Sequence, residues 1–142
     1  MKPTIILAAA ILICIACAPQ DDSLATSPVE IERAAQQLWN DTHAFDYSAI
    51  RSATTPEVEY ILFGSRMNID DFEEMLREFE ASLEGGSLDP YELREFNTKI
   101  IGNVAYTSWS SDEWLEAAVF IRQGDRWLLD RASAVEIETP SE

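Results

Sequence analysis

Apolar side chains recur at helical spacing in the chain after residue 26. Ser27 is a favourable N-cap, Pro28 suits the first helical position, and Glu30 completes a capping-box pattern. These residues begin an amphipathic helix whose apolar face consists of Ile31, Ala34, Ala35, Leu38 and Trp39. A shorter second helix is expected from its cap at Asp46 to about Ala53.

A strand and a third helix are predicted next. Residues 58–63 form a short apolar run typical of a buried strand, and residues 64–67 predict a turn. Asn68 or Asp70 is expected to cap a helix that ends at the glycines 85 and 86. Its apolar stripe consists of Ile69, Phe72, Leu76, Phe79 and Leu83.

The second half of the chain has the alternating pattern of β-strands, interrupted by turn signals. Four antiparallel strands are predicted, over residues 91–101, 104–109, 114–122 and 126–135. The order of helix, helix, strand, helix and four strands predicts an α+β domain with its helices on one face of a bent sheet.

Pairing across the turns predicts which side chains share a face of this sheet. If Trp109 pairs with Trp114, then Val104 and Tyr106 lie on an aliphatic face that suits the helices. A three-residue loop at 123–125 adds Trp127 and Arg131 to that face, whereas a two-residue loop puts them opposite. We favour three residues because Trp127 then lies in the core. The other face, expected to form a homodimer contact, carries Phe96, Trp109, Trp114, Glu116 and Phe120.

The N-terminus has the features of a bacterial lipoprotein signal. Lys2 precedes an apolar run over residues 5–16, and Cys17 follows the small residue Ala16. Residues 14–17 resemble a lipobox, although Cys14 stands where leucine is usual; ordinary secretion with cleavage nearby is the alternative. The sequence therefore predicts a signal peptide at 1–16, lipidation at Cys17, a tether to residue 26, one domain over 27–136 and a polar tail.

Location and partners follow from this leader and from the charge. The membrane contact would be through the lipid anchor, and Ala18 after the anchoring cysteine favours the periplasmic side of the outer membrane in a cell that has one. A formal net charge of −16 argues against nucleic acid as a partner. No cysteine follows Cys17, and neither a metal-ligand pattern nor a nucleophile motif is present, so no cofactor or metal is expected.

Each candidate site residue can also be explained by a purely structural role. His43 is interpreted as a surface histidine rather than a base. Tyr60 and Trp39 suit packing as well as ligand contact. Arg131 on a core-facing strand would need either a structural partner such as Glu59 or an anionic ligand.

The element order and the segment Phe-Ile-Arg-Gln-Gly-Asp-Arg-Trp-Leu-Leu at residues 120–129 resemble the nuclear transport factor 2-like superfamily, in particular its SnoaL-like, ketosteroid isomerase-like members. The resemblance covers residues 29–135 and implies a cone-shaped domain, with three helices packed on a curved, mainly antiparallel sheet around an apolar pocket. It also implies catalytic positions that this chain lacks, because Ile61 stands at the aspartate of the isomerases and Ser133 at a histidine of other relatives.

We therefore expect a non-catalytic module that binds a small apolar or amphipathic ligand. The alternative is an isomerase- or dehydratase-like enzyme acting on a small apolar carbonyl compound, and a third possibility is a structural subunit whose own side chains fill the pocket. The expected pocket residues are Trp39, Tyr60, Tyr106, Trp127 and Arg131.

Overall fold

The structure is a computed structural model that describes residues 27–85, 88–89, 92–111 and 114–136. The predicted signal, Cys17, the tether and the C-terminal tail lie outside these ranges, as does residue 91, the expected start of a strand. None of the helices within the described ranges is long and apolar enough to span a membrane.

Three helices form where the sequence predicts them, namely α1 (Pro28–His43), α2 (Tyr47–Ser52) and α3 (Ile69–Ser82). Each begins at the expected polar cap. The Ser27 side chain accepts a hydrogen bond from the Val29 amide, Asp46 accepts one from Ala49, and Asn68 caps α3. These caps fix where the helices start and therefore which side chains face the sheet.

Six strands form one sheet in the order β2-β1-β6-β5-β4-β3. Their bounds are β1 Thr54–Leu62, β2 Ser65–Met67, β3 Arg94–Ile101, β4 Val104–Ser110, β5 Trp114–Gln123 and β6 Arg126–Glu136. β1 runs parallel to β6, and every other pair is antiparallel. β1 begins four residues before the predicted start at Val58, and β2 replaces part of the predicted turn.

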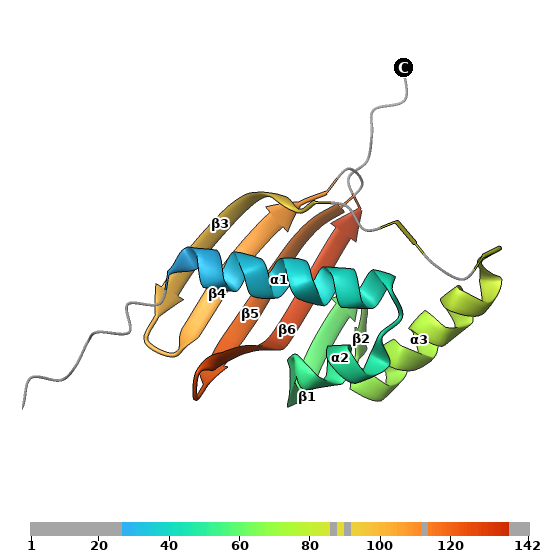
Figure 1. Ribbon diagram of the computed structural model, residues 1–142, viewed down its shortest axis with the longest axis horizontal. Coiled ribbons are helices and arrows are strands. Elements are labelled where there is room, and N and C mark those ends of the chain that lie inside the picture. Colours follow the sequence, from blue (N-terminus) through green and yellow to red (C-terminus); the bar gives the residue numbers. More distant parts are fainter. Residues whose placement is uncertain (1–26, 86–87, 90–91, 112–113, 137–142) are drawn as a thin grey trace, which may run out of the picture.

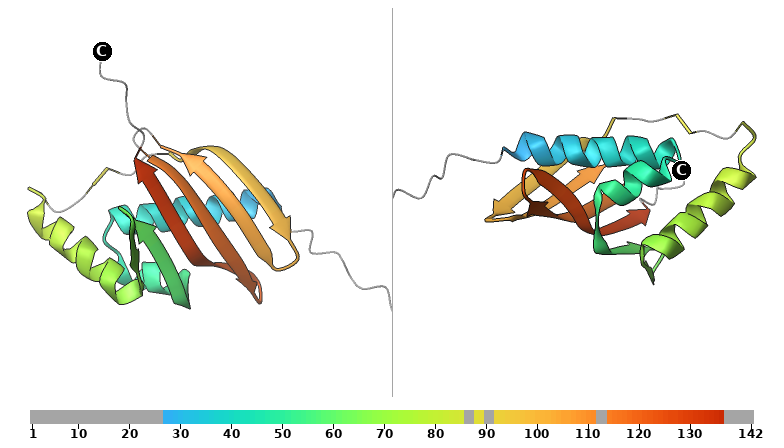
Figure 2. Two further views of the ribbon diagram at one scale, coloured as in Figure 1. Left: turned by 180° about the vertical axis from the view of Figure 1, so that it is seen from behind. Right: turned by 60° about the horizontal axis from the view of Figure 1, so that its bottom comes forward.

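The helices cover one face of the sheet, which we call the inner face (Figure 1). α1 lies across the strands, and α3 packs beside β1 and β2. Seen from behind, the strands present the opposite, outer face (Figure 2). This arrangement confirms the predicted α+β architecture. The core lies between the inner face and the helices, and its most completely buried large side chains are Ile31, Ile50, Phe120 and Leu129.

The inner face is the aromatic one, contrary to the prediction. Trp109 pairs with Glu116 rather than with Trp114, and Trp109 and Phe120 are buried under the helices. The aliphatic set that contains Val104 and Tyr106 lies on the outer face. Large rings fill the volume between a curved sheet and helices that cross it better than short aliphatic groups do. The dimer contact expected of the aromatic face is therefore wrong.

The hairpin between β5 and β6 has a two-residue loop, because Gln123 pairs with Arg126. The predicted three-residue loop is wrong, yet Trp127 is buried as expected. The shorter loop places Trp127 on the same face as Phe120, which is the face that the helices cover, and a bulge then changes the facing of the residues that follow. The β5–β6 register shifts between Val119 and Phe120, so Leu129 faces the core while Arg131 faces solvent.

Candidate functional site

Small side chains form the floor of the inner face at its centre. Ala118 of β5 pairs with Ala132 of β6, and Ala134 of β6 pairs with Glu116 of β5. Paired residues of antiparallel strands project to the same face, so these alanines lie together beneath the helices. Polar groups of the neighbouring strands stand round this alanine floor, and these groups define the candidate site.

Glu116 is the central polar group. Its side chain is buried, with 8% of the residue exposed, although it carries a carboxyl group. Burial raises the pKa of Glu116 to about 7, and the neighbouring Trp109 indole offsets part of that rise. Within the described residues, its Oε1 atom has no hydrogen-bond partner. A carboxyl group in this state exchanges a proton near neutral pH and can hold a hydrogen-bonding ligand.

Tyr60 borders the same floor from β1, where it pairs with Ala132. Its ring stacks on Phe72 of α3, with 3.8 Å between the ring centroids. Burial, and then the negative charge of Glu73, hold the pKa of Tyr60 well above its usual range. The hydroxyl therefore stays protonated and available as a donor, and no described residue accepts a hydrogen bond from it.

Glu73 is buried near Tyr60 but is committed to an ion pair. Arg51 of α2 approaches it at 2.5 Å, from Nε to Oε1, and also contacts Asp70. Removal of one partner from a buried ion pair of this kind is strongly destabilising. Glu73 therefore holds α3 against α2. Glu116 is the carboxyl group that can exchange a proton on the inner face.

The structure divides the five expected pocket residues between the two faces of the sheet. Tyr60 and Trp127 lie on the inner side, and Trp39 packs against the same core from α1. Tyr106 and Arg131 lie on the outer face, where Tyr106 pairs with Val119 and Val119 with Arg131. Residues on opposite faces cannot line one cavity, so the five do not form a single site.

Arg131 has the structural partner that the sequence offered as one of two alternatives. Its Nε lies 3.3 Å from Oε2 of Glu59, and Arg66 contacts the same carboxylate. Glu59 and Tyr60 are neighbours on β1 and project to opposite faces, so they cannot act together on one substrate.

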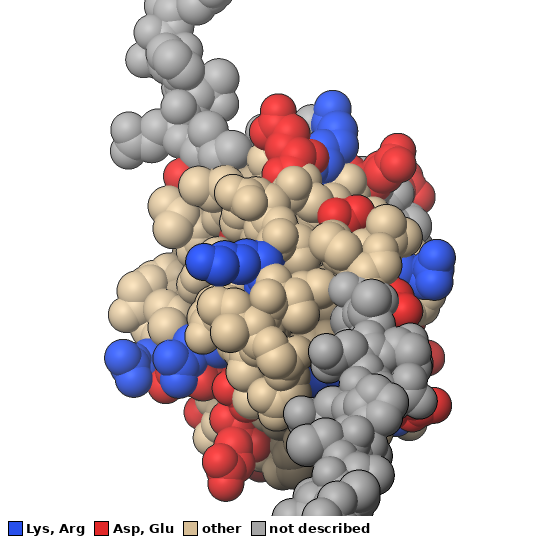
Figure 3. All heavy atoms as spheres, turned by 90° about the vertical axis from the view of Figure 1, so that its left-hand side faces the viewer, with Lys and Arg blue, Asp and Glu red and all other residues tan. Residues whose placement is uncertain are grey.

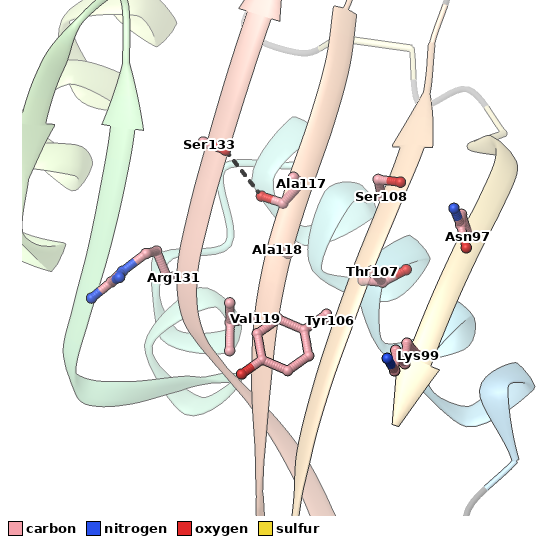
Figure 4. Close-up of a pocket in the computed structure, with 10 residues that line it drawn as sticks. All are labelled: Asn97, Lys99, Tyr106, Thr107, Ser108, Ala117, Ala118, Val119, Arg131 and Ser133. Carbon is pink, nitrogen blue, oxygen red and sulfur yellow. Dashed lines mark hydrogen bonds between the residues drawn. The ribbon is translucent and has the colours of Figure 1, made fainter. Parts of the chain in front are cut away.

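The outer face holds an open groove of about 430 Å³ over β3 to β6. Tyr106 lies beside Val119 in its centre, Lys99 stands on the β3 side, and Arg131 reaches away toward β1 (Figure 4). The end of the molecule where α1 begins shows acidic and basic side chains interspersed around an uncharged area (Figure 3). No basic surface that would suit a nucleic acid is visible on that face.

His43 lies in the last turn of α1, half-buried against the Trp39 ring. Its Nδ1 is 3.3 Å from the backbone oxygen of Asp89. Burial lowers the pKa of His43, and the contact with that carbonyl opposes the effect. Among the described residues, no group of three or more histidine, cysteine or acidic side chains is placed to hold a metal ion.

Sequence reasoning missed Glu116 as a site residue because it placed the aromatic face outward. A detectable signal was present. Glu116 is an acidic residue within an apolar strand, and it lies two residues before Ala118 and four before Phe120, so the three side chains project to the same face. Once Phe120 is known to be buried, strand alternation places Glu116 beneath the helices as well.

A scan of protein-family models finds no match for the chain, and a search of the curated proteins finds none either. Solved structures do match. An NTF2-like protein from Cytophaga hutchinsonii superposes with a TM-score of 0.64 at 12% identity, covering 75% of this chain and 95% of that chain. A protein from Streptomyces avermitilis, provisionally described as a dehydratase of the NTF2-like family, gives a TM-score of 0.65 at 13% identity, covering 78% and 96%.

The CaMKII hub of S. rosetta also matches, with a TM-score of 0.61 at 12% identity over 78% of this chain and 98% of that chain. The chain has the NTF2-like fold. The fold implied by the element order and the segment at 120–129 is thus confirmed. Function must be argued from the site, because proteins that share this fold need not share an activity.

Proposed function

We propose that the domain binds a small, mostly apolar molecule on the inner face of the sheet, with Glu116 as its polar anchor. The observation that carries this proposal is the buried Glu116 carboxyl group, whose Oε1 has no hydrogen-bond partner among the described residues. An unsatisfied buried polar group is costly, and a ligand that hydrogen-bonds to it offsets that cost.

The surroundings of Glu116 define the chemistry of the ligand. Alanines and aromatic rings surround the carboxyl group, so most of the ligand surface must be apolar. The Tyr60 hydroxyl and the protonated form of Glu116 are both donors, so the ligand should carry an acceptor such as a carbonyl or hydroxyl oxygen. A ligand that bears a full negative charge would meet repulsion from Glu73 and from the ionised form of Glu116.

The first prediction tests this anchor with a panel of small cyclic ketones and hydrocarbons of matching shape, by tryptophan fluorescence at pH 6. The wild-type protein should bind a ketone more tightly than the hydrocarbon. Glu116→Leu should weaken ketone binding by about tenfold, the value of one hydrogen bond, and leave hydrocarbon binding unchanged. Glu57→Gln, a change at an exposed residue of β1, is the matched control. If the wild type bound ketone and hydrocarbon with equal affinity, the result would contradict the role of Glu116 as an anchor. If none of the probes bound, the result would favour a structural subunit whose own side chains fill the pocket.

A catalytic role is the second candidate, because the pKa of Glu116 lies at about 7 and the Tyr60 hydroxyl borders the same floor. A base that titrates near neutral pH, together with a donor for a developing oxyanion, suits proton transfer next to a carbonyl group. Deuterium exchange into the same ketones tests this role. Exchange that disappears in both Glu116→Gln and Tyr60→Phe would establish an enzyme of the isomerase or dehydratase type.

We further propose that the protein is exported and held on a membrane by a lipid on Cys17, with the domain on the periplasmic side of the outer membrane where the cell has one. Support comes from Lys2, the apolar run at 5–16 and Cys17 itself. The second prediction is that Cys17→Ala moves the protein out of the membrane fraction or blocks its processing. Mass spectrometry of the wild-type protein should show acyl chains. The anchor would be ruled out if the Cys17→Ala variant stayed in the membrane fraction and its mass did not differ from that of the wild type by acyl chains.

Homodimer formation through the outer face completes the proposal. Large apolar side chains on that face are exposed to solvent, namely Ile101, Tyr106, Leu115 and Val135. A second copy of the chain would cover them. The third prediction is that the protein sediments as a dimer and that Leu115→Glu makes it monomeric. Phe79→Glu, on an exposed position of α3, is the control and should leave the dimer intact. A wild-type protein that stays monomeric at high concentration would contradict the proposal.

A further inference from the structure

Two aromatic rings and a carboxylate meet at one end of the sheet, apart from the core. The β1–β2 turn brings Phe63 there, β5 begins there with Trp114, and β6 ends there with Glu136. Trp114 and Glu136 are partners across the β5–β6 ladder, so their side chains project to the same face. We name these three residues the aromatic corner. They border a depression of about 320 Å³, together with Gly64, Ala134 and Val135.

Phe63 holds an unfavourable backbone conformation at this corner. Its φ angle is +52°, in the left-handed region, and the following Gly64 has a φ of +76°. Glycine and asparagine suit the first of these positions, whereas a larger side chain costs about 1 kcal/mol there. Phe63 is also 73% exposed, so burial in the core does not compensate for the strain. The packing that the described residues give this ring is its contact with Trp114.

The rings stand nearly at right angles, which gives the corner two aromatic walls. The centroids of Phe63 and Trp114 are 5.6 Å apart, and the ring planes meet at 85°. Aromatic faces carry negative electrostatic potential and attract cations. Glu136 adds a full negative charge beside them. Arg66, the basic residue of the same hairpin, is held by Glu59 at 3.1 Å and is not placed to neutralise the corner.

We propose that the aromatic corner binds a small, free organic ammonium ion of the quaternary type, such as choline. Such an ion is weakly hydrated, so aromatic walls can replace its water shell at low cost. A hard metal ion would need several oxygen ligands, and the described residues provide no such group. The depression has the volume of a small-molecule site, and the net charge of −16 raises the local concentration of cations.

Calorimetric titration of the full-length protein, kept in a nonionic detergent, tests the site with tetramethylammonium and choline. We expect saturable binding in the millimolar range or tighter. The uncharged alcohol in which carbon replaces the choline nitrogen should bind at least about tenfold more weakly, because it lacks the cation–π attraction. Trp114→Ala should weaken choline binding by a similar factor. Glu136→Gln should weaken it less and reduce its dependence on salt.

Phe63→Asn separates loss of the site from loss of the fold. Asparagine accepts the left-handed conformation, so this variant should melt at the same temperature as the wild type or higher while binding choline about tenfold more weakly. Glu57→Gln, a change at an exposed residue of β1, is the matched control and should leave choline binding intact. Phe63→Asn should also leave ketone binding at the inner face unchanged, because Phe63 lies outside the core. The aromatic corner can therefore fail without the proposed inner-face function failing, and the reverse also holds.

Three results of the titrations with free ligands would overturn the proposal. These are absence of heat with both ammonium ions, equal binding of the uncharged alcohol, and unchanged affinity in Trp114→Ala. Binding to phosphatidylcholine vesicles without binding to free choline would also overturn it, because the source of the ammonium group would then be a lipid headgroup. Binding only to lysine-containing peptides would likewise replace the free ion by a protein partner.

Discussion

Phe120→Ala is expected to destabilise the domain by about 3–5 kcal/mol, as deletion of a fully buried aromatic ring does. Phe120 is 1% exposed and lies on the inner face between Ala105 of β4 and Leu129 of β6. Its removal would leave a cavity that the flanking strands cannot close, because their hydrogen-bonded ladders fix their spacing. Urea denaturation of the wild type and the variant measures the difference in the free energy of unfolding.

The matched control is Tyr106→Ala on the neighbouring strand, measured at a concentration low enough to keep the protein monomeric. Tyr106 is about half exposed and projects to the outer face. Its truncation should cost less than about 1 kcal/mol, as is usual for an exposed side chain. A larger loss in Tyr106→Ala than in Phe120→Ala would mean that the helices cover the other face of the sheet.

Local sequence signals were sufficient to predict the three helices and every strand of the sheet except β2. Ser27, Asp46 and Asn68 cap the three helices because their side chains satisfy amide groups that the first helical turn leaves free. The predicted strands 104–109 and 114–122 form with their ends within a residue of prediction. β2 was missed because three residues carry too little alternation to distinguish a strand from a turn.

The facing of the sheet could not be predicted, because it depends on which face the helices cover and, for β6, on loop length and one bulge. A shift of one residue at the β5–β6 loop exchanges the two faces, and the extra residue near Asp130 exchanges them again. Trp127 is buried because the shorter loop places it on the aromatic face, and Arg131 is exposed because the bulge returns it to the aliphatic face. The prediction that the helices cover the aliphatic face placed Glu116 on a dimer contact, and so the central group of the candidate site was missed.

The titration of Glu116 gives the last prediction, a pH dependence of stability that Glu116→Gln removes. Burial raises the pKa of this carboxyl group from 4.5, its ordinary value, to about 7 in the folded protein. Between these two values the folded state holds a proton that the unfolded state has released. The unfolded state therefore binds fewer protons, and the free energy of unfolding falls as the pH rises through this window. The loss is complete above the folded pKa.

Glutamine mimics the protonated carboxyl group at every pH, so the variant should escape this loss. We expect both proteins to have similar stability at pH 4, and the variant to be more stable by about 3 kcal/mol at pH 8.5, the full effect of the pKa difference. Urea denaturation across this range measures the difference, with the exposed Glu57→Gln as control. The other carboxyl groups titrate in both proteins and cancel in the comparison. Parallel curves for the wild type and Glu116→Gln would show that Glu116 reaches water in the folded state, and would remove the buried anchor on which the proposed ligand site depends.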